Sequence, residues 1–380
     1  MQEQQTNITA LVSYKVFPPV MGGQKGIALF YQYLSELLPV TIVSTKNNES
    51  PNIPGIRFLP LLGNSKLRYA NPALFFKMQK VLRQTNCTHL IIEHPYYGWL
   101  GILLKRFCGV KLVVHSHNME AMRFKSTGRW WWKLLWQYER FVHRHADINF
   151  FITTEDRDYA VKHFALDPQT CHSVTYGIES SETPATAEKD TARQQLLQLH
   201  KINKTDRILF FNGTLDYKPN LDAVDIILEQ INPLLKKMNF NYKLIICGKN
   251  LPASYAGLEA FIPDNIIYAG FVDDIDVYFK GADIFINPVT DGGGIKTKVV
   301  EALSHGLSVV STASGAIGIP ATAVLNKMQV VNDGAWEDFT NAVIKCDPSQ
   351  KTPAAFFDHF YWGNIVARVH AILTKQENLN

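Results

Sequence analysis

Residues 284–311 read IFINPVTDGGGIKTKVVEALSHGLSVVS, the pattern of a strand, a glycine loop, a helix and a second strand. The runs 284–286 and 308–311 are short and strand-like, and the residues after the glycines are typical of the start of a helix. Strands that alternate with helices in this way build parallel sheets. The stretch therefore predicts a βαβ unit of an α/β fold, with Gly292, Gly293 and Gly294 in the loop before the helix.

Two lysines in the first turn of this helix indicate an anion-binding site. A helix start carries roughly half a positive charge, so Lys296 and Lys298 are unfavourable there by about 0.3–1 kcal/mol each unless an anion lies before them. The amides of the glycine run and the two ammonium groups suit a diphosphate. Glu301 projects from the same face as Lys298, where a carboxylate can accept two hydrogen bonds from a ribose diol. The alternative is an ordinary loop before a helix with a solvated Lys and Glu face.

The same alternation of strands and helices extends along the whole chain. It predicts two Rossmann-like, doubly wound parallel-sheet domains in series, at residues 1–180 and 181–355, facing a central cleft that would hold the ligand. A further helix is expected after residue 356. The predicted strands are 8–12, 40–43, 90–92, 112–114 and 148–152 in the first domain, and 208–211, 244–247, 266–268, 284–286 and 308–311 in the second.

Length and composition describe a globular protein of two domains. A chain of 380 residues exceeds one ordinary domain, and 46% hydrophobic with 19% charged residues provides ample core. The five cysteines are scattered without a CxxC spacing, which argues against a disulfide framework or a structural zinc site and fits a reducing cytosol. The sequence contains no signal-peptide pattern and no apolar run near the roughly 20 residues of a membrane span. We therefore expect a cytoplasmic protein.

The positive charge is concentrated in the first domain. Residues 1–180 hold 20 Lys and Arg against 12 Asp and Glu, a net charge of +8, whereas the remainder has a net charge of −4. A basic domain suggests an anionic acceptor, an anionic membrane surface or nucleic acid. The charges form no basic run or RNA-binding signature, so nucleic acid is not expected as a partner.

Two segments of the first domain follow predicted strands, where polar residues and glycines can reach a ligand. Gly22 and Gly23 lie between the first strand and a helix, although the pattern is not GxGxxG and a simple tight turn is the alternative. His117 lies in the segment HSHNME, where a neutral imidazole can hydrogen-bond a sugar hydroxyl. The competing interpretation is a helix cap made by Asn118, with His117 merely packed.

Two segments of the second domain have the same placement. Gly213 permits close approach of a ligand after strand 208–211, and Lys218 can reach a phosphate from there, although the residues around them can also only shape a turn. Phe271 and Val272 follow strand 266–268, where the backbone can contact the edge of a nucleobase.

The order of four motifs in the second half resembles the donor-binding domain of glycosyltransferase family four, also called glycosyl transferases group 1. The resemblance runs from residue 206 to the C-terminus and includes a branch with GGGxKxKxxEA and YxPN motifs. It implies the GT-B architecture, with an acceptor-binding first domain, a donor-binding second domain and a helix at 356–380 that crosses back to the first domain. The motifs are FNGTLDYKPNLDAV, LIICG, IIYAGFVDDIDVYFKGADIFINPV and GGGIKTKVVEALSHGLSVVST.

The resemblance also implies a role for each matching residue. It assigns the ribose hydroxyls to Glu301 and the donor phosphates or sugar to Gly293 and Gly294. The catalytic residues implied are His117, which contacts the donor sugar, and Lys218 and Lys298 beside the diphosphate. The remaining donor-binding residues are Gly22, Gly23, Gly213, Phe271, Val272, Gly292 and Lys296, with the two apolar side chains flanking the base.

This chain departs from the family pattern at two places. Many members have a glutamate eight residues before the ribose-binding one, where this chain has Gly293. Many also carry an arginine and a lysine around the glycine turn of the second domain, whereas here Thr214 and Pro219 interrupt that set. The branch with GGGxKxKxxEA shows the same differences, so the resemblance implies a variant site. It does not identify which cation neutralises the leaving diphosphate.

The function implied is transfer of a hexose from a UDP- or GDP-sugar to a glycan or lipid-linked acceptor, with retention of configuration, in cell-surface polysaccharide or lipopolysaccharide biosynthesis. No metal or other cofactor is expected, because lysines and helix amides can stabilise the diphosphate and the sequence has no DxD motif. A nucleotide-sugar epimerase of the same fold and a non-catalytic nucleotide-sugar binding protein are the alternatives. An epimerase would turn over donor without an acceptor, and a binding protein would show no turnover.

The segment 128–140, GRWWWKLLWQYER, combines tryptophans with basic residues in the basic domain. Such a helix can lie at a bilayer interface and make a peripheral contact with the inner membrane face. Its apolar residues are not confined to one stripe, which favours a helix buried against the first sheet.

Overall fold

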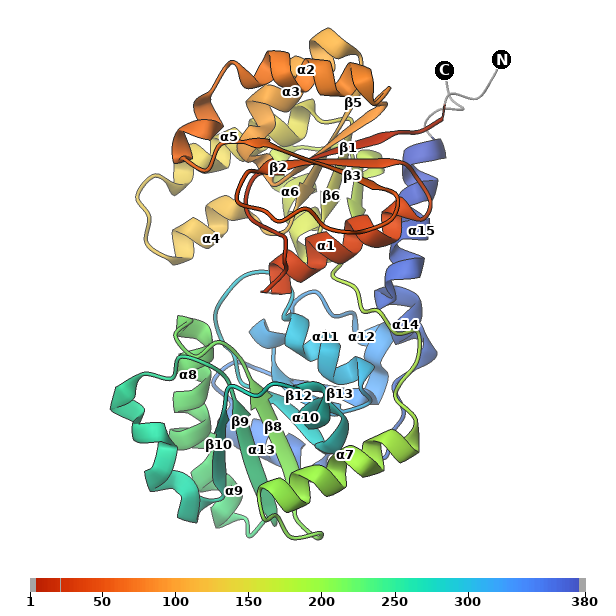
Figure 1. The fold of residues 1–380 in the computed structure, drawn as a ribbon. Helices are drawn as coiled ribbons and strands as arrows, with labels where there is room; N and C mark the ends of the chain where they lie inside the picture. The colour runs from red at the N-terminus through yellow and green to blue at the C-terminus, as the bar shows by residue number, and fades with distance from the viewer. Residues whose placement is uncertain (1–4, 21, 376–380) are drawn as a thin grey trace. The chain divides into compact units, whose positions relative to one another are not determined.

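The computed structural model describes residues 5–20 and 22–375, which form two compact units (Figure 1). Unit 1 comprises the chain up to Glu179 and from Tyr361 onward, and unit 2 is Ser180–Phe360. The sequence placed the corresponding boundaries after residues 180 and 355.

Unit 1 contains a seven-stranded parallel sheet in the order β3-β2-β1-β4-β5-β6-β7. The strand order reverses between β1 and β4, where Ile8 pairs with Val40 on one side and with His89 on the other. In open α/β sheets, ligands bind outside the carboxyl ends of the strands at such a switch point. The strands are β1 (Ile8–Val12), β2 (Val40–Thr45), β3 (Ile56–Leu62), β4 (His89–Glu93), β5 (Lys111–Ser116), β6 (Ile148–Phe151) and β7 (Cys171–Ser173).

Helices cover both faces of this sheet. Apolar residues of α1 and α15 pack with the sheet in one core cluster, and those of α2, α3 and α5 pack with it in a second. The helices of unit 1 are α1 (Gly22–Ser35), α2 (Leu74–Gln84), α3 (Gly98–Cys108), α4 (Glu120–Ser126), α5 (Trp132–His145), α6 (Thr154–Phe164) and α15 (Trp362–Lys375). Doubly wound packing of this kind explains why the central strands are continuous apolar runs.

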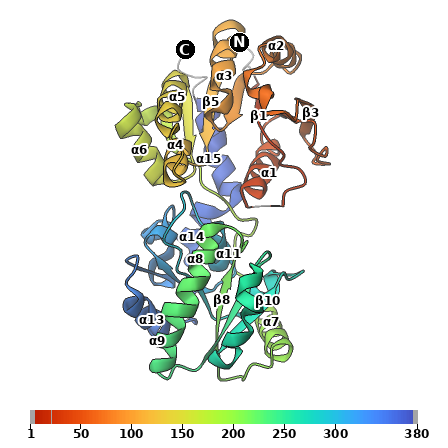
Figure 2. The same cartoon turned by 90° about the vertical axis from the view of Figure 1, so that its left-hand side faces the viewer.

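Unit 2 has a six-stranded parallel sheet in the order β10-β9-β8-β11-β12-β13, with the switch point between β8 and β11. Its strands are β8 (Arg207–Asn212), β9 (Tyr242–Cys247), β10 (Ile266–Gly270), β11 (Ile284–Asn287), β12 (Ser308–Thr312) and β13 (Met328–Val331). Its helices are α7 (Thr186–Leu199), α8 (Lys218–Ile226), α9 (Asn232–Lys237), α10 (Asp276–Gly281), α11 (Thr297–Ser304), α12 (Ala321–Val324), α13 (Trp336–Lys345) and α14 (Ala354–Phe360). Figure 2 shows α8 and β8 within this unit.

The structure confirms the two Rossmann-like parallel sheets and all ten predicted strands. Three strands were missed, and all three lie at a sheet edge: β3, β7 and β13. An edge strand is exposed on one side, and β3 has a single buried residue, Leu62, among half-buried and exposed ones instead of a buried run. The apolar signal that identifies central parallel strands is therefore weak at the edges.

The predicted single helix after residue 356 is wrong, because the chain breaks between α14 and α15 at Tyr361. There Tyr361 forms a bridge with Ile178, and the amide of Trp362 donates to the carbonyl of Ile178 at 3.0 Å. The apolar side of α15 then enters the core beside α1, so α15 belongs to unit 1 and α14 to unit 2. No helix among the described residues is long and apolar enough to cross a membrane.

Candidate functional site

The glycine loop of unit 2 connects β11 to α11 at the switch point. Gly292 and Gly294 adopt φ values of 94° and 71°, left-handed conformations that favour glycine. The ammonium group of Lys296 donates to the carbonyl oxygens of Gly292 at 2.5 Å and Gly294 at 3.2 Å. Lys296 therefore holds the shape of the loop in addition to supplying positive charge.

Lys298 lies one position into α11 and crosses to the first strand of the unit. Its Nζ atom donates to the carbonyl of Asn212 at 3.2 Å and to Oδ1 of Asn220 at 2.9 Å, and lies 4.3 Å from the centroid of the Phe211 ring. No carboxylate of the described residues forms an ion pair with it. Burial, with a smaller effect of Lys296, lowers the pKa of Lys298 to about 7. A desolvated cation without a counter-charge is stabilised by an anion.

Gly213 and Asn220 position Lys298. A β-carbon at Gly213 would lie 2.7 Å from Nδ2 of Asn220, so the absence of a side chain there makes room for the asparagine. Asn220 is held in turn by donating to the carbonyl of Thr214 at 3.0 Å. The glycine predicted to approach a ligand thus has a demonstrable role within the protein.

Asn212 is a site residue that sequence reasoning missed. It ends β8 at the switch point, and its Oδ1 atom is buried without a hydrogen-bond partner in the described structure. An unpaired buried acceptor costs free energy that a ligand donor can recover. Its position directly after the buried run 208–211 is a signal that could have identified it.

The other predicted residues of unit 2 are distributed along the same sheet edge. Glu301 is half-buried one turn after Lys298 on α11, as the spacing predicts. Lys218 is exposed and paired at 2.5 Å with Asp222, one turn along α8. Phe271 is 72% exposed and Val272 is half-buried after β10, which lies two strands from β8. Lys298 and Gly213 are thus connected through Asn220, which contacts both. Among the described residues, neither Lys218 nor Phe271 forms a hydrogen bond with this group.

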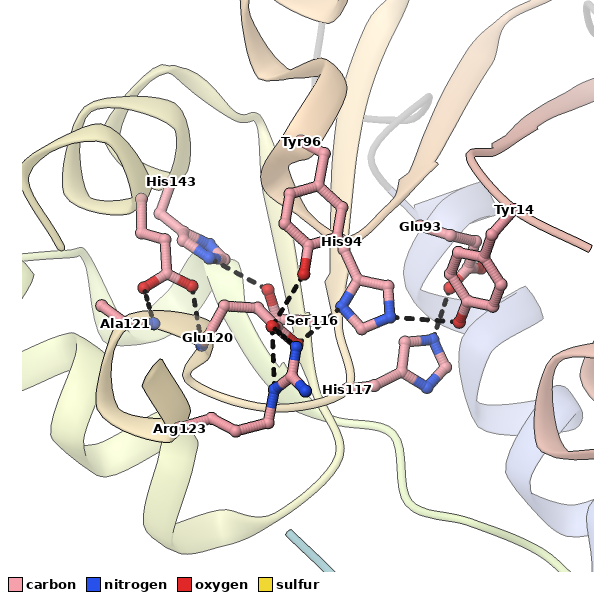
Figure 3. Close-up of polar contacts among 11 residues, drawn as sticks. Tyr14, Glu93, His94, Tyr96, Ser116, His117, Glu120, Ala121, Arg123 and His143 are labelled. Atoms are coloured by element: carbon pink, nitrogen blue, oxygen red, sulfur yellow. Dashed lines mark hydrogen bonds and ion pairs between the residues drawn. The ribbon is translucent and has the colours of Figure 1, made fainter. Parts of the chain in front are cut away.

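Unit 1 has a buried carboxylate, Glu93, at the carboxyl end of β4. Its Oε1 accepts from the Tyr31 hydroxyl at 2.5 Å and lies 3.2 Å from Nδ1 of His115. Its Oε2 lies 2.5 Å from Nε2 of His117, a pair visible in Figure 3. Glu93 is 1% exposed and His115 2% exposed.

These contacts define the protonation of the group. Burial alone would raise the pKa of Glu93, but the two imidazoles and their hydrogen bonds hold it well below its usual range. Burial lowers the pKa of His117 to about 4, against the opposing effect of Glu93. An ionised carboxylate only accepts hydrogen bonds, so both rings donate to it. The remaining nitrogen of His117, Nδ1, is therefore a hydrogen-bond acceptor.

The ligand atoms of Glu93, His115 and His117 all lie within 4.8 Å of one another, which is close enough to hold a metal ion. Two imidazoles and a carboxylate are common ligands of divalent transition metals. In the described structure both carboxylate oxygens of Glu93 already accept hydrogen bonds. The group is therefore equally consistent with a hydrogen-bonded carboxylate–histidine network that holds no metal. Chelation distinguishes the two.

A second buried carboxylate, Glu120, opens α4 beside this group. Its Oε2 accepts from the Tyr96 hydroxyl at 2.7 Å and from Nε of Arg123 at 3.0 Å, and its Oε1 lies 3.3 Å from Nδ1 of His94 (Figure 3). The Tyr14 hydroxyl, which follows β1, lies 3.2 Å from Nε2 of His94. Although burial opposes it, the His94 and Arg123 contacts lower the pKa of Glu120 to about 2.

Backbone strain occurs in the same group. His94 has φ 62° and ψ 158°, a region that is essentially reserved for glycine and costs about 1–3 kcal/mol. Its amide donates to the carbonyl of His115 at 2.9 Å, which ties the strained residue to β5. Such strain persists where the surroundings over-determine the conformation, as they do between β4 and β5.

The alternative role of Asn118 as a helix cap is not observed. The residue before α4 is Met119, which makes no side-chain cap, and the cap comes instead from Glu139 of α5. Its two carboxylate oxygens accept from the amides of Glu120 and Ala121 at 2.9 and 2.8 Å. The polar segment after β5 is therefore ordered by a residue twenty positions away in the chain.

Gly22 and Gly23 lie in the first turn of α1 and not in a turn before it. A β-carbon at Gly23 would meet no atom within 4 Å. The described structure contains no contact that requires a glycine at 23, and the two residues join neither Glu93 nor His117 through a hydrogen bond.

Sequence reasoning missed Glu93, His94 and Glu120, although it selected His117. Glu93 and His94 directly follow the apolar run 90–92, so their position at a strand end was available. Glu120 was not, because a carboxylate at a helix start is usually a solvated residue favoured by the helix dipole. Its burial depends on contacts with His94 and Tyr96, which follow β4 more than twenty positions earlier in the chain.

Three histidines with lowered pKa values, the buried His89 and His143 and the half-buried His117, make unit 1 sensitive to acid. Burial lowers the pKa of His89, His117 and His143 to about 4 each, below the value of about 6.5 of an unfolded chain. A lowered histidine pKa stabilises the fold fully above pH 6.5, and this stability is lost as the pH falls toward 4. We expect the unfolding free energy to fall by about 2 kcal/mol per histidine between pH 7 and pH 5.

Urea unfolding at the two pH values measures this loss. His143→Gln should lose less stability than the wild type on acidification, whereas the exposed His163→Gln should behave as the wild type does. Equal unfolding free energies at pH 7 and pH 5 would show that these rings are not held neutral by burial.

Family comparisons match both halves of the chain. The model described as Glycosyltransferase Family 4 matches residues 21–182, and the model described as Glycosyl transferases group 1 matches residues 206–346. A curated relative, the uncharacterized 44.6 kDa protein in the cps region of Klebsiella pneumoniae, is 25% identical over 276 residues. That alignment covers 69% of this chain and spans 64% of the length of the relative.

Solved structures resemble the fold over nearly the whole chain. A glycosyltransferase from Rickettsia africae has a TM-score of 0.72 at 13% identity, covering 99% of this chain and all of that one. HepE of Anabaena, solved with UDP, has a TM-score of 0.70 at 13% identity and covers 97% of this chain and 100% of its own. WaaG, a glycosyltransferase of lipopolysaccharide biosynthesis, has a TM-score of 0.62 at 15% identity over 98% and 99% of the two chains.

Proposed function

Because the chain belongs to the glycosyltransferases of group 1 and family 4, which have the GT-B fold, we propose that it transfers a sugar from a nucleoside-diphosphate sugar to a glycan or lipid-linked acceptor. The observation that carries this proposal is Lys298, a half-buried cation at the switch point of unit 2 that lacks a carboxylate partner among the described residues. A donor diphosphate is the anion that would compensate it.

The diphosphate lies, in this proposal, against the glycine loop. Lys298 and Lys296 supply positive charge, and the loop amides at Gly293 and Gly294 supply hydrogen-bond donors. Asn212, with its unpaired buried oxygen, contributes an acceptor for a hydroxyl or amide of the donor. Lys218 contributes less charge, because it is exposed and already paired with Asp222.

The nucleoside is assigned to Glu301, Phe271 and Val272. Glu301 accepts hydrogen bonds from the ribose hydroxyls, one turn after Lys298. Phe271 and Val272 are assigned to the base, which would cover an aromatic ring that is otherwise 72% exposed. UDP or GDP is the expected nucleotide, and the UDP complex of the structurally similar HepE supports the first of these.

The Glu93 group of unit 1 is assigned to sugar recognition. With Nε2–H directed at Glu93, the Nδ1 atom of His117 can accept a hydrogen bond from a hydroxyl group of the sugar. Glu93 is the residue that holds this tautomer, so we assign it a positioning role. Gly22 and Gly23 at the start of α1 are assigned to the same ligand, and a β-carbon at Gly23 would meet no atom within 4 Å.

The proposed reaction retains the configuration of the sugar. The bond between the anomeric carbon and the phosphate oxygen breaks, and the acceptor oxygen forms its bond on the same face. The leaving diphosphate takes the proton of the acceptor hydroxyl, and Lys298 stabilises the negative charge that develops there. No metal ion or separate catalytic base takes part in this scheme.

The epimerase alternative is weakened by the two carboxylates that could serve it. An epimerase that first eliminates the nucleotide needs a carboxyl group that exchanges a proton near neutral pH. The pKa of Glu93 is held well below its usual range and that of Glu120 is about 2. Burial raises the pKa of Glu139 to about 8, but this side chain is 0% exposed and both of its oxygens accept from backbone amides, so it cannot reach a substrate. Donor consumption without an acceptor would favour the epimerase, and donor binding without any turnover would favour a binding protein.

The biological setting proposed is assembly of a cell-surface polysaccharide in the cytoplasm. The relative encoded in a cps region supports the first part. The five cysteines, none of which forms a disulfide, support a reducing compartment.

Thermal shift with UDP, GDP, ADP, CDP and their sugar conjugates tests the donor site. A ligand at 100 times its Kd should stabilise the fold by about 2.7 kcal/mol, which raises Tm measurably. We expect one diphosphate to raise Tm and Glu301→Ala to abolish the shift, because the ribose loses its acceptor. The exposed Glu337→Ala, on α13, should leave the shift unchanged. No shift with any nucleotide would contradict the proposed donor site.

A further inference from the structure

The helices α2, α3 and α5 cover one face of the unit 1 sheet, and their outer side has an unusual charge balance. Between residues 63 and 146 the chain has fourteen Lys and Arg and three Asp and Glu. The three carboxylates, Glu93, Glu120 and Glu139, are each at most 1% exposed. The bases have few internal partners, since only Lys105 and Arg123 pair with a carboxylate in the described residues. The exposed charge of this layer is therefore positive apart from Asp147, which follows α5 and pairs with Lys105.

The same layer exposes large apolar side chains. Trp130 is 82% exposed, Phe76 71%, Leu134 68% and Phe107 65%, and Leu103 and Phe141 are also exposed. The three helices are nevertheless packed on the sheet. Their opposite sides bury Leu82 of α2, Leu104 of α3 and Val142 of α5 in the core. The exposed apolar side chains on the outer side are therefore not part of the core, and an exposed apolar patch of this kind is typical of an interaction surface.

Apolar and basic residues interleave on each helix. On α5, Leu134 and Phe141 are seven positions apart and so lie on one face, and Lys133 and Arg144 flank them. Trp130 lies in the turn just before α5 and is exposed as well. On α2, Phe76 has the exposed Lys77 and Lys80 beside it, and on α3 Phe107 has Arg106. Because α3 packs against both α2 and α5, the three helices form one layer on this face of the sheet.

We propose that this outer face of α2, α3 and α5, the α2–α3–α5 surface, binds the anionic surface of a lipid bilayer. Its bases match the phosphates of anionic headgroups, and its protruding rings and aliphatic chains match the acyl boundary beneath them. A nucleic acid would satisfy the charge but leave Leu103, Leu134 and Phe141 without a partner. The surface extends well beyond the tryptophan-rich segment 128–140, for which burial against the sheet was the favoured prediction. The 82% exposure of Trp130 and 68% exposure of Leu134 contradict that prediction for these two residues.

This inference goes beyond the proposed transfer activity and is tested on the full chain by co-sedimentation with vesicles. The wild type should bind vesicles rich in phosphatidylglycerol at low salt and bind phosphatidylcholine vesicles at least about tenfold more weakly. Binding should weaken as the salt concentration rises, because the Debye length shortens. Equal binding to the two lipids, or no binding to phosphatidylglycerol, would overturn the proposal.

Two sets of variants separate the charge and the apolar contributions. Trp130→Ser with Leu134→Ser and Phe141→Ser, and separately Lys133→Glu with Arg144→Glu, should each weaken binding about tenfold or more. A matched control changes exposed residues of unit 2, Ile262→Ser with Lys237→Glu, and should bind as the wild type does. Undiminished binding by both surface variants would place the membrane contact elsewhere and overturn the assignment.

The remaining outcomes are separable. Each variant is first shown to keep the circular dichroism spectrum and the Tm of the wild type. Tight binding of a short single-stranded RNA, lost in the variants, together with weak vesicle binding would identify nucleic acid as the partner and overturn the proposal. Nucleotide-induced thermal shift is measured in parallel, because a failed donor site leaves vesicle binding unaffected.

Discussion

Replacing Lys298 by methionine is expected to lower kcat/KM for sugar transfer by about a hundredfold to a thousandfold, the usual effect of removing one preorganised group that stabilises developing charge. Methionine preserves the length and apolar stem of the side chain. It removes the ammonium group that lies 2.9 Å from Asn220 and 4.3 Å from the Phe211 ring. The loss is expected in kcat as well as KM, because the diphosphate is most strongly charged when it leaves.

A comparison of ligands separates an electrostatic role from a structural one. Lys298→Met should weaken binding of the nucleoside diphosphate strongly and binding of the nucleoside only slightly. The control is Lys237→Met in the last turn of α9, at the opposite end of the sheet strands, which should have the activity of the wild type. Equal loss of nucleoside and diphosphate binding in Lys298→Met would show that the lysine only holds β8 and α8 together.

The pH dependence of donor binding gives the same test without a mutation. Burial lowers the pKa of Lys298 to about 7 in the free protein, so the ammonium form prevails below that pH. An intact nucleotide sugar, whose diphosphate carries no titrating proton in this range, should bind more tightly at pH 6 than at pH 8. Lys298→Met should lack this difference. Weaker donor binding at pH 6 than at pH 8 would contradict the assignment of the charge to Lys298.

Replacing Glu93 by glutamine is expected to lower kcat by about a hundredfold while leaving the nucleotide-induced thermal shift unchanged. Glu93 accepts hydrogen bonds at both oxygens, whereas a glutamine accepts at one and donates at the other. One imidazole must then change its tautomer or lose its partner. If His117 changes, its Nδ1 atom becomes a donor and no longer accepts from a sugar hydroxyl, which costs an oriented contact of the transition state.

The pH profile distinguishes this positioning role from simple damage to the fold. Glu93 raises the pKa of His117 against the effect of burial, so its removal should move the acid limb of the kcat profile to lower pH. A general loss of structure would lower kcat at every pH and also lower Tm. The exposed Glu179→Gln, which alters a surface pair with Lys25, is the matched control and should retain wild-type kcat.

Chelation addresses the metal alternative for the same group. If Glu93, His115 and His117 form only a hydrogen-bonded network, incubation with a chelator should leave kcat unchanged. Loss of activity that returns on addition of a divalent metal would show that the three residues ligate an ion, and Glu93→Gln would then abolish that recovery.

The extent to which this protein could be predicted from its sequence differs between fold and site. Central parallel strands are buried on both faces, so each one appears as an apolar run that needs no knowledge of its neighbours. The edge strands β3, β7 and β13 lack that run because half of their surroundings is solvent. The break at Tyr361 was missed for a related reason. It depends on a contact with Ile178, more than 180 positions away, and no local helix signal reports such a contact.

The spacing of residues along one element was sufficient to select Lys298 and Glu301, since positions three apart on a helix share a face whatever surrounds them. The sequence by itself therefore determined the two doubly wound sheets, the glycine loop before α11 and the charged face of that helix. Only the tertiary structure decided that Lys298 packs against β8, that Glu93 orients His117, and that Trp130 and Leu134 lie outside the core. These properties depend on which strand ends and helices meet in space. The charge of each group is set by its burial and its hydrogen-bond partners, and both depend on the tertiary contacts between these elements.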